Sequence, residues 1–224
     1  AWDFLMATDF FPEEKAALLE EKLTAVTQQF YDAYVLDDAM RQYALTVTQN
    51  NHPIRTAAAI GVVGLAFEAH PEAATWRDWA VSELDYLLGS DGQYIQPDGA
   101  VSEGPFYFNY GFAPALAFFI ALDNRDLPER VYHRNCINRS DVDPWTGHGC
   151  VEDEPFTFSN PMQNDLFHLA MDWSLSLRLP NGNRAPIADS SLRNQSAPAL
   201  FPHFGGEEYL YWDWASNPSD PYKV

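Results

Sequence analysis

Two short segments of this 224-residue chain carry polar side chains whose types and spacing could do chemistry. The first is Asn50-Asn51-His52-Pro53, directly before an almost uncharged stretch with helical spacing. Free backbone N–H groups at a helix N-terminus attract anions, and the side chains of Asn51 and His52 add donors there. The segment could therefore hold a carboxylate. From this segment alone, however, the simpler interpretation is favoured, in which Asn50 or Asn51 caps the helix and His52 is a satisfied boundary residue.

The second segment runs through residues 98–110 and leads from a polar turn into another apolar stretch. Tyr107 and Tyr110 are three residues apart, so in a helix they share a face. Their hydroxyls would lie near the loop end of the fold, where a substrate could reach them. The alternative is that both rings belong to the core and that their hydroxyls find buried partners.

Taken together, these segments resemble the heparinase II/III-like polysaccharide lyases, which include alginate and heparin lyases. The resemblance covers about residues 40–195. It rests on three motifs in order, namely Asn51-His52, Asp-Gly followed by Glu-Gly-Pro-x-Tyr-x-x-Tyr in 98–110, and Pro-Asn-Gly followed by Pro-Ile-Ala-Asp-Ser in 180–190. Members often have glycine where Ala188 stands. The resemblance implies an (α/α) toroid, normally followed by a β-sandwich domain, and an elimination at a uronic acid that needs no metal or other cofactor.

The chemistry of such an elimination fits the residues that the resemblance singles out. Removing the C5 proton beside an ionised carboxylate requires donors that neutralise this carboxylate, a role that the resemblance gives to Asn51 and His52. The resemblance makes Tyr107 the general acid, and in some members also the base. Only about one free tyrosine in a thousand is ionised at pH 7, a handicap of about 4 kcal/mol for a base, and a neighbouring cation would reduce it.

Four further residues are candidates for substrate binding: Arg55, Glu103, Tyr110 and Arg134. Arg55 follows His52 by about one turn and is the only charge in its stretch, so it could assist Tyr107 or clamp the substrate carboxylate. It could equally be the structural partner of a buried acid such as Glu103. Some family members have an acid at this position, which leaves the stereochemistry of the substrate open.

Arg134 is one of four arginines within residues 125–139, after the stretch that carries Tyr107. They could form a basic subsite for a polyanion, or they could pair with nearby acids in a solvated loop. The charges close to the arginines decide whether a polyanion can bind there, because the overall negative charge of the protein is screened beyond about 8 Å at physiological salt.

The elements that must position these residues are predicted from the spacing of apolar side chains. Helical spacing predicts helices at residues 13–35, 38–48, 53–69, 73–88, 105–122 and 164–177. The first of them has an apolar stripe formed by Leu19, Leu23, Val26, Phe30 and Tyr34. Gly61 and Gly64 would each cost about 1 kcal/mol within a helix, which predicts close approach of a neighbouring helix. Residues 89–104 and 123–160 and the tail from 179 are predicted to be loops.

Amphipathic helices alternate along the chain with nearly uncharged ones, which predicts two layers of helix. The predicted fold class is therefore all-α, as an (α/α) toroid or a double-layered incomplete α/α barrel, because a simple bundle would make all its helices amphipathic. We expect residues 1–224 to form a single toroid domain. We also expect this chain to be a fragment that lacks further helices and the C-terminal β-sandwich domain, which usually supplies a second catalytic histidine.

Composition excludes several classes of protein. The chain is 46% hydrophobic, enough for a sizeable core, and 32 acidic against 13 basic residues give a net charge of −19. This charge excludes a generally basic nucleic-acid-binding protein. No apolar run reaches the roughly 18 residues of a membrane span without polar interruption. The nearest run is interrupted by Asn109, Gly111 and Pro114.

The same composition suits an exported protein, and we predict a periplasmic or extracellular location. Cys136 and Cys150 share one loop-like stretch and could form a disulfide, although two free thiols fit the same count. The chain starts at Ala1, so we expect that a leader has been removed or that the chain is a piece of a longer protein.

The predicted partner is an acidic polysaccharide or oligosaccharide; the polymer and the oligomeric state stay open. One rival is a glycoside hydrolase of the same architecture with two carboxylates, such as Glu103 and Asp189, about 5–9.5 Å apart. The other rival is a glycan-binding module without catalytic activity.

Overall fold

The computed structural model describes residues 12–36, 50–125, 131–134, 151–180, 183–188 and 211. This part is mostly helical, with 64% helix and 7% strand, which is compatible with the predicted all-α class. Its elements are the α-helices α2 (Glu13–Tyr31), α4 (Asn51–Ala66), α5 (Ala73–Leu88), α6 (Pro105–Asp123) and α7 (Asp165–Ser176), the π-helix η1 (Asp32–Leu36), the 3-10 helix η2 (Pro161–Gln163), and the strands β1 (Val131–His133) and β2 (Pro155–Thr157).

Five of the six predicted helices are confirmed, with shifts of a few residues at their ends. The predicted helix at 38–48 lies outside the described residues, as do Cys136, Cys150 and Asp189. The prediction that 123–160 is all loop was wrong, because β1 and β2 pair antiparallel with Val131 opposite Thr157. Strands of three residues are too short to show the alternation by which a strand is recognised in a sequence.

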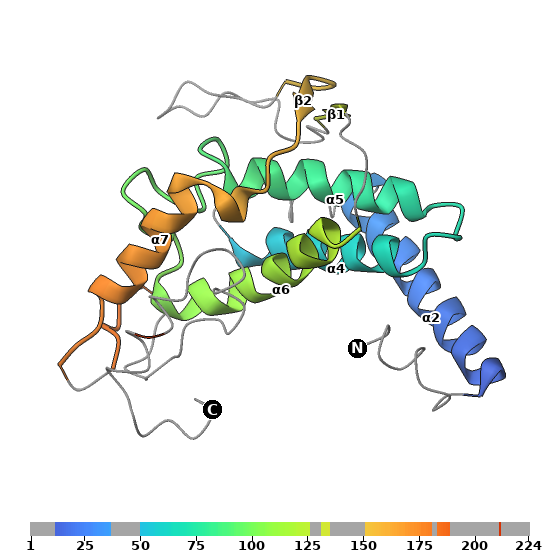
Figure 1. The fold of residues 1–224 in the computed structure, drawn as a ribbon, viewed down its shortest axis with the longest axis horizontal. Helices are drawn as coiled ribbons and strands as arrows, with labels where there is room; N and C mark the ends of the chain where they lie inside the picture. The colour runs from blue at the N-terminus through green and yellow to red at the C-terminus, as the bar shows by residue number, and fades with distance from the viewer. Residues whose placement is uncertain are drawn as a thin grey trace.

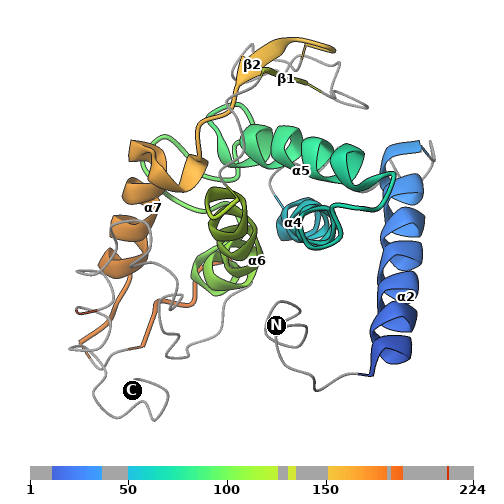
Figure 2. The ribbon, with the colours of Figure 1, turned by 45° about the vertical axis from the view of Figure 1, so that its right-hand side comes forward.

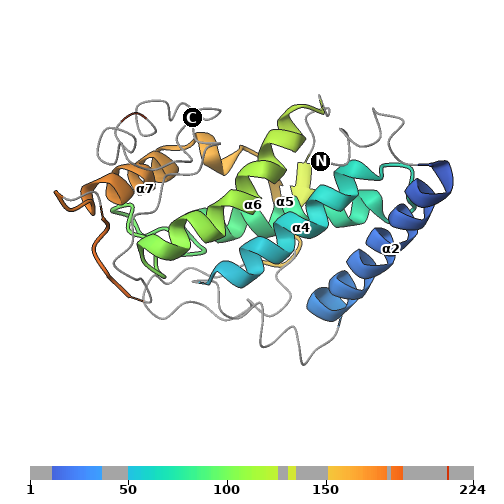
Figure 3. The same cartoon turned by 90° about the horizontal axis from the view of Figure 1, so that it is seen from below.

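The two nearly uncharged helices lie side by side, and the other helices surround them. Figure 2 looks along α4 and α6, with α5 above them, α2 beside α4 and α7 beside α6. Figures 1 and 3 show the same neighbours from two other directions. α7 is joined to α6 by ring contacts, Phe108 with Trp173 and Phe112 with Phe167. In this part of the chain, the two nearly uncharged helices therefore have other helices packed against them on several sides.

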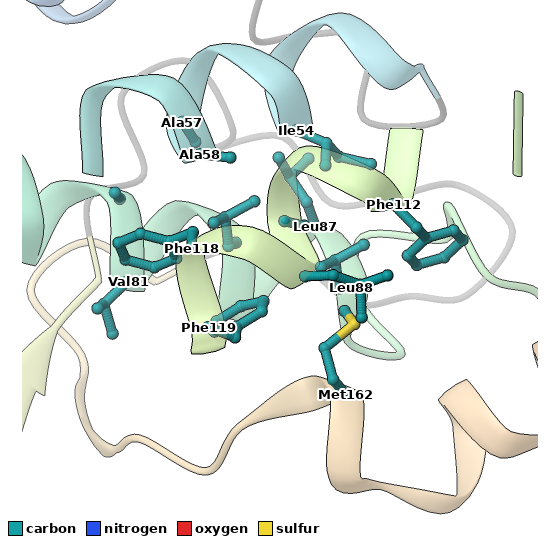
Figure 4. Close-up of a cluster of buried hydrophobic side chains, with 14 of the residues drawn as sticks. Ile54, Ala57, Ala58, Val81, Leu87, Leu88, Phe112, Phe118, Phe119 and Met162 are labelled. Atoms are coloured by element: carbon teal, nitrogen blue, oxygen red, sulfur yellow. The ribbon is translucent and has the colours of Figure 1, made fainter. Parts of the chain in front are cut away.

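The core lies where α4, α5 and α6 meet. Figure 4 shows Ile54, Ala57 and Ala58 of α4 facing side chains of α5 and the phenylalanine rings of α6, with Met162 of η2 closing one side. These side chains are buried. Among the described residues, α6 is one helix whose length and apolar composition would allow it to cross a membrane, but its phenylalanine rings are used in this core.

The glycines in the middle of α4 are explained by close packing, as predicted. A Cβ added at Gly61 would come 2.4 Å from the Phe118 ring and 2.7 Å from Cβ of Ala80. A Cβ at Gly64 would come 2.7 Å from the carbonyl oxygen of Ala73. Gly61 therefore lets α4 approach α6 and α5 at once, and this approach brings the N-terminal ends of α4 and α6 within reach of each other.

α2 is helical as predicted, but it does not pack through the face expected from its apolar stripe. It buries Ala16, Thr24 and Thr27, whereas Phe30 is 50% exposed and Val26 and Leu23 are also exposed. The buried face is adjacent to the stripe around the helix. α2 lies beside α4 in Figure 2, and its Tyr31 ring packs edge-to-face on Trp79 of α5.

Candidate functional site

The start of α4 is fixed by a side-chain cap. Asn50 has an extended backbone, and its side-chain oxygen accepts a hydrogen bond of 2.8 Å from the backbone N–H of His52. The capping interpretation is therefore confirmed for Asn50. The cap leaves His52 exposed on the first turn and turns Asn51 inward, where it is only 1% exposed.

Glu103 occupies the anion-binding position at this helix start. Its carboxylate accepts a hydrogen bond of 2.5 Å from the backbone N–H of Asn51. It also accepts bonds of 3.0 and 3.1 Å from the Asn51 side-chain amide. A carboxylate at a helix N-terminus is favoured by the helix dipole and by charge-assisted hydrogen bonds. Asn51, which we predicted to donate to a substrate carboxylate, thus holds a carboxylate of the protein itself. Its own side-chain oxygen is buried and has no hydrogen-bond partner among the described residues.

Arg55 and the two tyrosines meet beside this contact. The guanidinium carbon of Arg55 lies 3.9 Å from the centre of the Tyr110 ring, a cation–π contact. The Tyr107 and Tyr110 rings are 5.9 Å apart in an edge-to-face arrangement. Tyr107 is half-buried and Tyr110 is 45% exposed. The alternative, that both rings belong to the core, therefore does not hold for Tyr110.

Sequence reasoning missed Tyr94, which lies under this site. It is fully buried, and its hydroxyl is 3.2 Å from the backbone oxygen of Tyr107, to which it donates. Burial raises the pKa of Tyr94 well above its ordinary value, and the neighbouring Glu103 carboxylate raises it further. The one available signal was Gly111 inside an apolar helix, because a Cβ there would come 2.5 Å from the Tyr94 hydroxyl oxygen.

Arg134 is held elsewhere, against α5. Its guanidinium forms a short ion pair with Asp85, donates to the backbone oxygen of Ser82 at 3.2 Å, and lies 4.0 Å from the centre of the Phe156 ring. Arg125 donates instead to the backbone oxygen of Leu65. The other two arginines of the predicted basic group fall outside the described residues. The contacts of Arg134 are thus structural, and its partner comes from a helix rather than from its own loop.

A pocket of about 290 Å³ lies next to this ion pair. Its lining does not include the residues of the α4 and α6 helix starts; it consists of Asp85, Tyr86, Gly89, Ser90, Asp91, Arg134, Ser159, Pro161 and Asn164. It is therefore distinct from the place where Asn51 meets Glu103.

Removing the guanidinium of Arg134 should make the stability of the protein depend more steeply on pH. Burial raises the pKa of Asp85, and Arg134 lowers it. In Arg134→Met this pKa rises further, because the buried carboxylate loses its compensating charge. A carboxyl whose pKa is raised by folding contributes stability fully below its unfolded pKa, near 4, and this contribution is lost as the pH rises through the folded pKa. We expect Arg134→Met to lower Tm by several degrees more at pH 7 than at pH 4, as measured by thermal unfolding.

The matched control for this measurement is Lys22→Met, whose ion pair with Glu21 is exposed and should contribute little at either pH. An equal loss of Tm at both pH values in Arg134→Met would contradict the ion pair's role.

The third motif is described only in part. Ala188 has a φ of +54°, the left-handed region that favours glycine, and the resembling proteins often have glycine there. Within the described residues, no three His, Cys, Asp or Glu side chains come together in a way that could hold a metal ion.

Comparisons with models of protein families, with curated proteins and with solved structures found no match.

Proposed function

We propose that this protein is a polysaccharide lyase of the heparinase II/III-like type, which cleaves a uronic-acid-containing polysaccharide by β-elimination. The supporting observation is that Asn51 and Glu103, 52 positions apart, are joined by three hydrogen bonds. This contact joins the start of α4, which carries His52, to the segment directly before α6, which carries Tyr107. It supports the proposal that the two segments that resemble the family belong to one site.

The substrate carboxylate is neutralised in this proposal by the donors that remain available to it. His52 is exposed on the first turn of α4, and Arg55 is half-buried about one turn further along the helix. Asn51 is buried and already donates to Glu103. Its part in the reaction is therefore to hold the helix start and Glu103 in place, and His52 and Arg55 are the groups that reach the uronate.

Tyr107 moves the proton in this proposal. As a phenolate it takes the C5 proton, and the resulting phenol gives this proton to O4 of the leaving sugar while the C4–O4 bond breaks and a C4–C5 double bond forms. As the base it would need its phenolate stabilised. The guanidinium of Arg55 lies against the ring of Tyr110, which in turn contacts Tyr107. No cofactor takes part in this scheme.

We further propose that the described helices belong to an (α/α) toroid and that the protein acts in the periplasm or outside the cell. The first proposal is supported by the packing of α5, α2 and α7 against the nearly uncharged α4 and α6. The acidic composition supports the second.

The direct test is to incubate the full chain with alginate, heparan sulfate, chondroitin and hyaluronan and to follow absorbance in the near ultraviolet. Elimination creates a conjugated double bond and raises the absorbance, whereas hydrolysis produces new reducing ends with no such rise. Reducing ends without absorbance would show a glycoside hydrolase, and binding without either signal would show a glycan-binding module. Both results would contradict the proposal.

Arg55 offers a test of how the carboxylate is bound. We expect Arg55→Met to raise KM for the uronic-acid substrate by about 10-fold or more, with a smaller change in kcat, because a charge-assisted hydrogen bond of about 1.5–3 kcal/mol is lost. Lys22→Met also removes one positive charge, from an exposed position on α2, and should leave KM unchanged. An unchanged KM in Arg55→Met would exclude Arg55 from substrate binding.

A further inference from the structure

Tyr94 belongs to the loop before α6 and lies where this loop meets α4 and α6. Its ring packs on Phe112 of α6, with the ring centres 5.7 Å apart. A Cβ built on Gly111 would come 2.5 Å from the Tyr94 hydroxyl and 3.5 Å from Cβ of Asn51. The hydroxyl of Tyr94, the backbone of α6 and the first residue of α4 are therefore close neighbours.

The polar contacts of Tyr94 connect the parts of the proposed active site. Its hydroxyl donates to the backbone oxygen of Tyr107 at 3.2 Å. Its own backbone oxygen accepts hydrogen bonds from the N–H of Ser102 at 3.0 Å and from the Ser102 hydroxyl at 3.2 Å, and Ser102 is the residue before Glu103. Tyr94 thus contacts the segment that carries Glu103 through its backbone and the first turn of α6 through its hydroxyl.

A purely apolar packing role would not require this hydroxyl. Burying a hydroxyl is unfavourable unless it is hydrogen-bonded, and phenylalanine would fill the same space without that penalty. The glycine at 111 is a second sign, because it leaves room on α6 for the hydroxyl and glycine costs about 1 kcal/mol within a helix. Both features are accounted for if the hydroxyl fixes Tyr107 relative to Glu103.

We propose that Tyr94 is a positioning residue of this site, and this inference rests on the proposed lyase function. Its hydroxyl holds the first turn of α6, which carries Tyr107, and its backbone oxygen holds Ser102, next to the Glu103 that accepts hydrogen bonds from Asn51. The separation between the Tyr107 phenol and His52 is thereby set before a substrate arrives. Since small displacements of a proton donor reduce catalysis strongly, losing this tie should affect turnover more than binding.

The test is Tyr94→Phe, which removes the hydroxyl and keeps the ring. We expect kcat to fall at least 10-fold while KM changes less than twofold, measured well below the Tm of the variant. Tyr132→Phe is the matched control, because Tyr132 is also a buried tyrosine but lies on β1, packed against Phe156 and Phe158. It should keep the wild-type kcat. A Tyr94→Phe variant with wild-type kcat, or with KM raised and kcat unchanged, would overturn the proposal.

Hydrogen exchange measured by NMR keeps this test separate from the test of the lyase function. In Tyr94→Phe the amides of Asn51, which donates to Glu103, and of Phe108, in the first turns of α6, should exchange at least 10-fold faster. The same amides should be unchanged in Tyr132→Phe. If amide exchange is unchanged in Tyr94→Phe, the positioning role of Tyr94 is wrong, whatever the activity of the variant. If exchange is faster in Tyr94→Phe but the wild-type protein forms no unsaturated product, the lyase function is wrong. The structural role of Tyr94 would then still hold.

Discussion

Tyr107→Phe should lower kcat about 10²- to 10⁴-fold, the usual contribution of a positioned general acid, and leave KM nearly unchanged. The reason is that only the phenolic hydroxyl is lost. The ring contacts of Tyr107 with Phe106 and Tyr110 are retained in the variant. The measurement is the rate at which near-ultraviolet absorbance rises at saturating substrate.

Tyr34→Phe is a suitable control for this experiment, since Tyr34 lies on η1 and packs against Phe30 rather than against the site. It should have wild-type turnover. If Tyr107→Phe kept full activity, Tyr107 would not be the proton donor and the proposed mechanism would be wrong.

Gly61→Ala should lower the free energy of unfolding, although alanine is the better helix former. The new methyl group would overlap the Phe118 ring and Cβ of Ala80. Overpacking of this kind costs about 1–3 kcal/mol, whereas the gain in helix propensity is about 1 kcal/mol. We expect a net destabilisation of up to about 2 kcal/mol, measured by urea unfolding.

Two further variants separate packing from helix propensity. Ala59→Gly, on the exposed side of the same helix, should lose about 1 kcal/mol by propensity alone. Adding Phe118→Leu to Gly61→Ala should recover part of the loss, because it makes room for the methyl group. A Gly61→Ala protein more stable than wild type would show that α4 and α6 are not in such close contact.

The helices that could be predicted from the sequence are those whose own residues show an apolar and a charged face at helical spacing. α5 was predicted with the same limits, 73–88, because apolar and charged side chains alternate along it at helical spacing. The face of α2 could not be predicted in the same way. Which face it buries depends on the elements that pack against it, and that face carries the short side chains of Ala16, Thr24 and Thr27 rather than the larger apolar stripe.

The candidate site could be predicted only as two separate segments. The helix start at Asn51 and the tyrosine pair at 107 and 110 were recognisable by residue type and spacing. Their contact depends on Glu103, whose partner lies 52 positions away, and a local pattern carries no information on such a distance. Tyr94 was missed for the same reason, since its role depends on tertiary contacts with Tyr107 and Gly111.

The Glu103 carboxylate at the start of α4 has a consequence for selectivity. Because it is tethered, it competes with any dissolved anion at an effective concentration that is at least millimolar for a short linkage. Dilute acetate or a single free sugar acid would rarely displace it. The backbone N–H of Asn51 is thereby withheld from dissolved anions, and under the proposed function a substrate carboxylate is left to the exposed His52 and to Arg55.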